Sequence, residues 1–247
     1  DVCSSDLDLD LALVNKSTFT TIAIDGAFTS TVRNVSTSQS LAVNAAGTST
    51  TLLFKDVAGT ADAYKINFNA DNAANTNAGI VVINKIETVT VNSVGKTGVT
   101  NTITLTDDAA KSLVITGDKD LIVNFATGFG DTATATNGLG VSTIDASAST
   151  AGITLGTSIS NLKTAWSGLT IKGGAGKDMI NMTGLTLPAA DSKIIVNAGA
   201  GDDTIVTSGA GGTLTGGAGK DAFIVSAAVA TGATEAKSVL TTITAVD

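Results

Sequence analysis

The sequence predicts an all-β chain that coils into a right-handed parallel β-solenoid or β-roll, preceded by an N-terminal β-rich module. Three observations predict this class. Short runs of alternating apolar and polar residues recur along the chain, which is the period of a strand with one buried face. Only 4% of the 247 residues are aromatic and 27 are glycine, which suits a thin solenoid core. Near-identical glycine-rich strings also recur in the last third of the chain.

The alternating runs predict where the strands lie, namely at residues 20–24, 40–44, 63–67, 80–83, 88–92, 102–106, 112–116 and 121–125. We expect three parts. Residues 8–86 form a β-rich module, either sandwich-like or made of irregular rungs. Residues 87–172 form a solenoid lead-in, and residues 173–247 form a β-roll that is truncated at its C-terminus. The one helical pattern covers residues 234–240.

The first seven residues are set apart from the rest. Their sequence, Asp-Val-Cys-Ser-Ser-Asp-Leu, reads as the translation of a sequencing-adapter tail. We therefore expect residues 1–7 to be an artefact and the natural sequence to begin near Asp8. Cys3, the single cysteine, would then be foreign to the protein.

The repeated string is Gly-Gly-Ala-Gly-Lys-Asp, and its two copies end at Asp178 and Asp221. A third copy, which ends at Asp203, has Asp202 in place of Lys, and it departs from the pattern Gly-Gly-x-Gly-x-Asp only at the first glycine, where Ala198 stands. In each copy a large apolar residue follows the Asp two places later. All three therefore match a nonapeptide known from parallel β-rolls. A flexible Gly-rich linker, the alternative interpretation, gives no reason for this regular apolar position.

The residue types of this repeat suit a hard cation. Glycines permit backbone turns that aim several carbonyl oxygens at one point, and the Asp adds a negative charge. Ca²⁺ takes about six to eight oxygen ligands. The chain has no His and one Cys, so the usual ligands of zinc and copper are missing. The sequence therefore predicts Ca²⁺ as the bound ion.

Spacing predicts which loops share the ion. With two nonapeptides per coil, Asp203 and Asp221 lie 18 residues apart in stacked loops, and they form the main predicted site. Asp178 lies 25 residues before Asp203, so a second site requires a bulge, which we place at residues 185–190. In the nonapeptide between Asp203 and Asp221, Gly212 stands where the Asp belongs, which predicts a roll loaded mainly on one side. The other predicted metal-site residues are Gly173, Gly174, Gly176, Gly199, Gly201, Gly216, Gly217, Ala218 and Gly219.

These nonapeptides resemble those of the RTX family, secreted bacterial proteins whose repeats form Ca²⁺-loaded β-rolls. With the lead-in strings at 111–118 and 142–148, the chain is most similar to the C-terminal part of RTX-type surface-layer proteins. The resemblance implies type I secretion, an extracellular structural role at the bacterial cell surface, and folding on Ca²⁺ binding after export. It also implies a partner at the cell surface, either further copies of the protein in a surface lattice or a cell-surface polysaccharide. An adhesin or stalk, and the C-terminal tail of a secreted protease or lipase, stay open as alternatives.

Composition argues against other classes of function. Without His, a Ser-His-Asp triad or a His-Glu-x-x-His zinc site cannot form. The acidic pairs Asp107-Asp108 and Asp118/Asp120 lack the aromatic surroundings of a glycosidase cleft, because the chain has one Trp and one Tyr. We therefore expect no enzyme, and we expect Asp118 and Asp120 to face water or to form a further Ca²⁺ site. The net charge of −8 argues against nucleic acid, and no apolar run is long enough to span a membrane.

Overall fold

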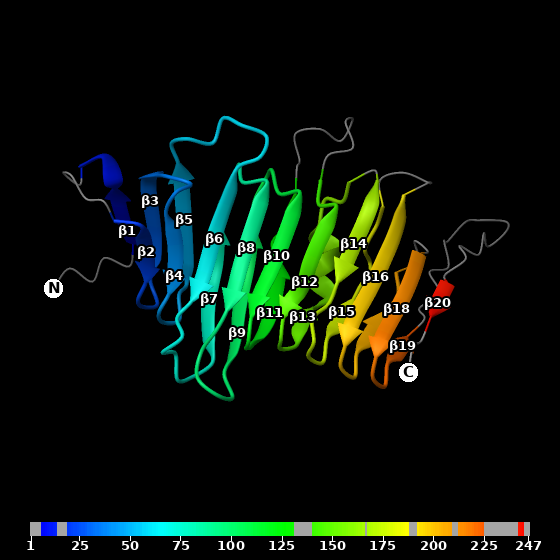
Figure 1. The fold of residues 1–247 in the computed structure, drawn as a ribbon. Helices are drawn as coiled ribbons and strands as arrows, with labels where there is room; N and C mark the ends of the chain where they lie inside the picture. Colours follow the sequence, from blue (N-terminus) through cyan, green and yellow to red (C-terminus); the bar gives the residue numbers. More distant parts are fainter. Residues whose placement is uncertain are drawn as a thin grey trace.

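The chain forms two parallel sheets that face each other in a β-solenoid (Figure 1). The computed structural model describes residues 6–13, 19–130, 140–165, 167–187, 192–208, 212–224 and 242–244. Successive strands alternate between the sheets, so each pair of consecutive strands makes one rung. The predicted all-β solenoid is thereby confirmed. The helix predicted over residues 234–240 lies outside the described residues.

Each sheet has ten strands within the described part of the chain. The odd-numbered sheet contains β1 (Asp6–Asp10), β3 (Thr29–Val35), β5 (Ser49–Phe54), β7 (Thr76–Val82), β9 (Thr100–Thr106), β11 (Asp120–Phe125), β13 (Ile153–Leu155), β15 (Met179–Asn181), β17 (Thr204–Val206) and β19 (Ala222–Ile224). The even-numbered sheet contains β2 (Thr21–Ile24), β4 (Ser40–Val43), β6 (Ala63–Phe68), β8 (Thr88–Ser93), β10 (Ser112–Gly117), β12 (Thr143–Ser149), β14 (Gly168–Lys172), β16 (Lys193–Ala200), β18 (Gly212–Ala218) and β20 (Thr242–Thr244). Two short 3₁₀ helices, η1 (Leu11–Leu13) and η2 (Thr157–Asn161), accompany the strands.

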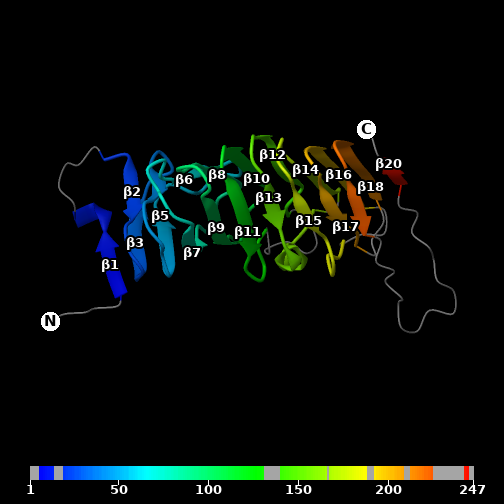
Figure 2. The same cartoon turned by 90° about the horizontal axis from the view of Figure 1, so that it is seen from below.

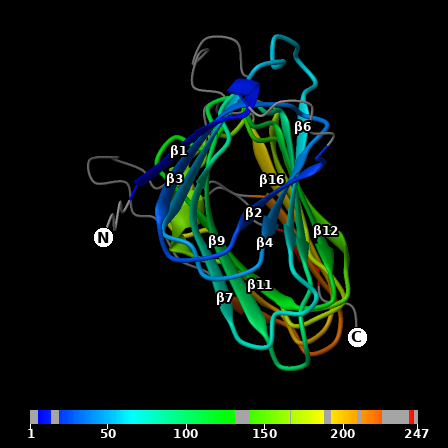
Figure 3. The same ribbon diagram turned by 90° about the vertical axis from the view of Figure 1, so that its left-hand side faces the viewer.

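The rungs follow one another in chain order along a single axis, as the colour sequence in Figure 2 shows. Neighbouring strands within both sheets run parallel. Viewed along the axis, the two sheets enclose a narrow interior (Figure 3). Thin rungs of this kind need few bulky side chains, in agreement with the low aromatic content.

The interior is built from columns of apolar residues in register. One column in the even-numbered sheet consists of Val89, Leu113, Ile144, Ile171, Val196 and Leu214, all buried. Alternate residues of each strand face outward, as in β9, where Ile103 and Leu105 are buried between partly exposed threonines. A slip of one residue would turn the apolar set to solvent, so the alternation also determines the register.

The strands before residue 87 belong to the same stack. β6 pairs with β8, and β7 pairs with β9, so the pairing crosses position 86 without interruption. The sequence leaves two arrangements open for residues 8–86, a sandwich-like module or irregular rungs, and the structure has rungs. No described helix is long and apolar enough to cross a bilayer.

Two borders of the solenoid carry the connections. We call the border where even-numbered strands turn into odd-numbered ones the loop edge, which lies at the bottom of Figure 1, and the other border the opposite edge. One rung is longer than the next. The partners Asn181 and Val206 are 25 residues apart, whereas Ile194 and Gly212 are 18 apart, so seven additional residues lie between β15 and β16. This connection contains the bulge predicted at 185–190, of which residues 188–190 lie outside the described part.

Candidate metal site

Three aspartates form a column along the loop edge. Asp178, Asp203 and Asp221 each stand immediately before the strands β15, β17 and β19, and these strands pair in register through Met179, Thr204 and Ala222. The structure thus brings together all three aspartates of the nonapeptides. Earlier rungs have Leu121 and Ile153 at the same level, both buried. The acidic column therefore continues a buried column that is apolar in the two preceding rungs and polar before them, at Asn101 and Thr76.

Glycines allow the loops of this edge to stack closely. Gly199 and Gly217 are paired in β16 and β18 and have φ values of 104° and 107°, which side chains with a Cβ rarely adopt. A Cβ on Gly217 would collide with the carbonyl oxygen of Gly199, and one on Gly219 would collide with that of Gly201. The peptide oxygens of one loop therefore lie directly against the glycines of the next.

The remaining predicted residues lie in the same loops. A Cβ on Gly173 would collide with Asp178 Oδ2, and one on Gly216 would collide with Asp221 Oδ2. In the third copy this place is held by Ala198, which is buried. The loop residues Gly174, Gly176 and Ala218 also lie at the loop edge, whereas Gly212 begins β18 at the opposite edge.

Main-chain hydrogen bonds tie each aspartate to the rung before it. The backbone N–H of Ile153 donates to Asp178 Oδ1 at 2.7 Å, that of Asp178 donates to Asp203 Oδ1 at 2.7 Å, and that of Asp203 donates to Asp221 Oδ1 at 3.1 Å. One oxygen of every carboxylate is thus fixed by the same type of bond. Each aspartate thereby joins its own rung to the one before it.

The second carboxylate oxygen distinguishes the three residues. Asp178 Oδ2 accepts a hydrogen bond from the N–H of Gly174 at 2.8 Å, so both of its oxygens are bonded. Asp203 Oδ2 and Asp221 Oδ2 are buried and have no hydrogen-bond partner among the residues that the structure describes. Buried carboxylate oxygens without partners are costly, and metal coordination is one way to offset that cost.

The electrostatic environment disfavours charge on this column. Burial raises the pKa of Asp178 to about 7, with smaller opposing contributions from the N–H groups of Ile153 and Gly174. Burial likewise raises the pKa of Asp203 to about 6, and the nearby Asp221 and Asp202 add repulsion. In the described residues no Lys or Arg forms an ion pair with the column. A bound cation would supply the missing positive charge.

The donor atoms fit calcium better than a metal held by side chains alone. In the described part of the chain no three His, Cys, Asp or Glu side chains are grouped so that they could hold a metal ion. A cation between Asp203 and Asp221 would therefore depend on peptide oxygens as well as on the two Oδ2 atoms. Carboxylate and carbonyl oxygens are the ligands that Ca²⁺ accepts, in a geometry that tolerates irregularity.

The other acidic pairs have local roles. Asp118 forms an ion pair with Lys119 at 2.7 Å, and Asp120 Oδ1 accepts a hydrogen bond from the N–H of Gly152 at 3.0 Å. Both aspartates line a surface depression of about 300 Å³ on the loop edge, together with residues 97–99. Asp120 thus joins two rungs as the column residues do, but it is exposed.

One buried carboxylate lies where the sequence does not predict a site. Asp107, at the opposite edge, is 1% exposed. Its Oδ1 accepts hydrogen bonds from the N–H groups of Ala109 at 3.0 Å and Ile86 at 3.4 Å, and its Oδ2 has no partner in the described part of the chain. Burial raises its pKa to about 8. The only sequence signal was the acidic pair Asp107-Asp108, which does not distinguish a buried residue from an exposed one.

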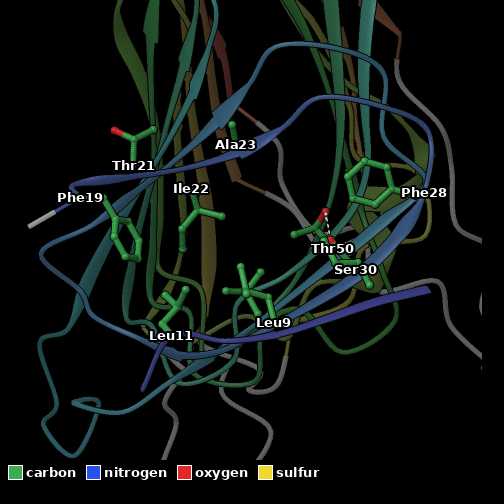
Figure 4. Close-up of a pocket in the computed structure, with 11 residues that line it drawn as sticks. Leu9, Leu11, Phe19, Thr21, Ile22, Ala23, Phe28, Ser30 and Thr50 are labelled. Carbon is green, nitrogen blue, oxygen red and sulfur yellow. Dashed lines mark hydrogen bonds between the residues drawn. The ribbon is translucent and has the colours of Figure 1, made fainter. Parts of the chain in front are cut away.

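An apolar pocket of about 290 Å³ lies at the N-terminal end of the stack (Figure 4). Leu9, Leu11, Phe19, Ile22 and Phe28 contribute to its wall. Ser30 and Thr50 also line it, and their hydroxyl groups form a buried hydrogen bond 3.1 Å long. The pocket belongs to the first rungs, at the opposite end of the solenoid from the acidic column.

Comparison with known proteins adds no relative. No protein-family model matches the chain, and no curated protein matches it.

Proposed function

We propose that this chain is a calcium-stabilised structural segment of a secreted bacterial cell-surface protein, similar in kind to a surface-layer subunit. One observation carries the proposal. Two stacked, buried carboxylate oxygens, Asp203 Oδ2 and Asp221 Oδ2, have neither a hydrogen-bond donor nor a cationic side chain beside them in the described residues. The long two-sheet stack with a continuous core is suited to a rigid structural role.

Main-chain hydrogen bonds and glycines position the oxygen atoms of the site. The N–H groups of Asp178 and Asp203 fix one oxygen of each carboxylate and thereby orient the other. The glycines let the loops approach until peptide oxygens lie beside the next loop. A bound Ca²⁺ ion would supply the positive charge that the column lacks. Because only the folded loops present these oxygens together, binding and folding would be coupled.

This coupling fits export. Where calcium is scarce, the acidic loops around Asp203 and Asp221 repel one another, so the last rungs of this acidic chain resist compaction. Outside the cell, calcium meets sites whose dissociation constants in extracellular modules are about 10⁻⁴–10⁻³ M. Self-association into a surface lattice would then bring folded solenoids together on the cell.

A calcium titration followed by circular dichroism tests the proposal. Starting from chelated protein, we expect β-sheet signal to increase with a midpoint near 10⁻⁴–10⁻³ M, about the range of extracellular modules. Asp221→Ala removes a free carboxylate and should raise the midpoint about tenfold or more. Asp71→Ala removes an exposed acid of equal charge and should leave it unchanged. A wild-type spectrum and melting temperature indifferent to calcium and chelator would refute the proposal.

A further inference from the structure

The apolar core becomes thinner toward the acidic column. The rung of β10 and β11 buries Leu113, Ile115, Leu121, Val123 and Phe125. The rung of β16 and β17 buries Ile194, Val196, Ala198 and Ile205. In the described residues of β18 and β19, Leu214 is the one buried apolar side chain, Phe223 is partly buried, and Ile224 is 51% exposed. Since burial of apolar area is the main favourable contribution to folding, the rung of β18 and β19 receives little of it.

The last of these rungs is also rich in glycine, as is the rung of β14 and β15. Gly212, Gly216, Gly217 and Gly219 all lie in or directly after β18, and glycine is the residue with the greatest backbone entropy to lose. In the solenoid each rung contacts mainly its neighbours, so a weak rung at an end is not stabilised by distant parts of the chain. We therefore expect stability to differ along the axis.

Asp178 stands between the earlier rungs and the two rungs that contain Asp203 and Asp221. Its side chain is fully buried, and its two oxygens accept hydrogen bonds from Ile153 of the preceding rung and from Gly174 of its own loop. Both oxygens thus have main-chain donors without a cation. The buried core continues past it, from Ile153 and Ile171 to Val196 and Ile205 of the next rung. Ahead of it, Asp203 and Asp221 each keep one oxygen without a partner.

We propose that Asp178 joins its own loop to the preceding rung without a metal ion, a role that we call a clasp. The solenoid up to this residue is then stable by itself, and dependence on calcium is confined to the rungs of β16–β17 and β18–β19. The chain up to β15 then folds on its apolar core alone and offers β14 and β15 as a template for the last rungs. The second half of this proposal rests on calcium binding by Asp203 and Asp221. It assigns Asp178 a positioning role rather than the predicted role of a metal ligand.

Hydrogen exchange of the wild-type chain, measured by mass spectrometry in calcium and in chelator, tests the confinement. In chelator we expect amides of residues 194–223 to exchange at least about tenfold faster, and those of residues 88–125 to change by less than about twofold. Fast exchange throughout the chelated chain would overturn this inference and leave the calcium proposal standing. Exchange identical in both conditions everywhere would overturn both.

Matched Asp→Asn variants test the clasp. In Asp178→Asn an NH₂ group replaces one carboxylate oxygen, so one of the two N–H groups, of Ile153 or of Gly174, loses its acceptor. We expect that amide to exchange about tenfold faster, equally in calcium and chelator. Asp203→Asn should instead abolish the protection that calcium gives residues 194–223. Asp71→Asn, at an exposed position, serves as the control.

The two variants separate a clasp from a ligand. An effect of Asp178→Asn that appears only in calcium would show that Asp178 holds the metal and would overturn the proposal. Should Asp178→Asn fail to fold, failure in calcium and in chelator alike would be the metal-independent loss that a clasp predicts. Failure in chelator with rescue by calcium would contradict it.

Discussion

Asp107 shows how a single carboxylate can both complete this fold and limit its stability. It accepts two main-chain hydrogen bonds that join a turn to the preceding rung, but its second oxygen is buried without a partner. Burial is the main cause of its raised pKa, and the charges of Asp108 and Glu87 add to the effect. The ionised form is therefore destabilised in the folded chain relative to the unfolded chain.

The sign of the pH effect follows from two pKa values. The pKa of Asp107 is about 8 in the folded chain, against 3.8 for an ordinary aspartate, which we take for the unfolded chain. Between these values the folded chain binds a proton that the unfolded chain lacks, so the free energy of unfolding decreases as pH rises from about 4 to about 8. Below this window the residue is protonated in both states and contributes no further dependence.

Asp107→Asn should remove this dependence. Asn keeps an oxygen that can accept the N–H groups of Ile86 and Ala109 but has no charge to bury. We expect the variant to gain about 1–3 kcal/mol in free energy of unfolding relative to wild type near pH 9, and little near pH 5. Urea denaturation at both pH values measures the difference. A variant that is destabilised equally at both pH values would show that the buried charge does not lower the free energy of unfolding. Asp71→Asn, at an exposed position, is the control.

The individual strands were largely predictable because alternation is a local signal. The runs predicted at 112–116 and 121–125 correspond to β10 and β11, and Ile180, Ile205 and Leu214 of the nonapeptides are buried as their positions predict. The partner of each strand was not predictable before residue 87. A period of two specifies which face is buried, but the same pattern fits a rung and a sandwich strand.

The elements should differ in how they respond to loss of core volume. Leu113→Ala in β10 opens a cavity in a well-filled rung, so we expect a loss of about 2–5 kcal/mol, the same with and without calcium. Leu214→Ala in β18 should instead leave the main thermal transition in place and raise the calcium concentration needed to protect the last rungs. Circular dichroism melting in calcium and in chelator distinguishes them. Leu53→Ala, 39% exposed, is the control. Equal responses of the two buried variants would contradict the difference between the rungs.

At the scale of the whole molecule, the sequence predicted the acidic column but not how far the stack of rungs extends. The three nonapeptides alone indicated a roll and its acidic column, because the Asp and glycine positions have a specific backbone reason. The continuation of the same stack back to β1 has no comparable signature, since residues before 87 lack the Gly and Asp spacing. Neither could the sequence show that Asp178 has both oxygens bonded, because that depends on the N–H of Gly174 in the folded loop.

Net charge provides a test of ion specificity. Raising NaCl from about 10 mM to about 150 mM shortens the screening length from about 30 Å to about 8 Å, so repulsion within a chain of charge −8 should weaken and the melting temperature rise by a few degrees. About 2 mM CaCl₂ should protect the last rungs beyond this screening effect, whereas MgCl₂ at equal concentration should not, because Mg²⁺ demands stricter geometry. Equal protection by both ions would indicate screening alone.

The long connection between β15 and β16 bears on how such a chain can change its length. Seven additional residues lie between these two strands, yet the strands on both sides keep their partners without a shift. The sheets thus restrict the spacing of strands but not the amount of sequence between them at that corner. Additional sequence at this connection leaves the pairing on both sides intact, which makes it a natural point at which the chain can acquire a new segment while its scaffold stays the same.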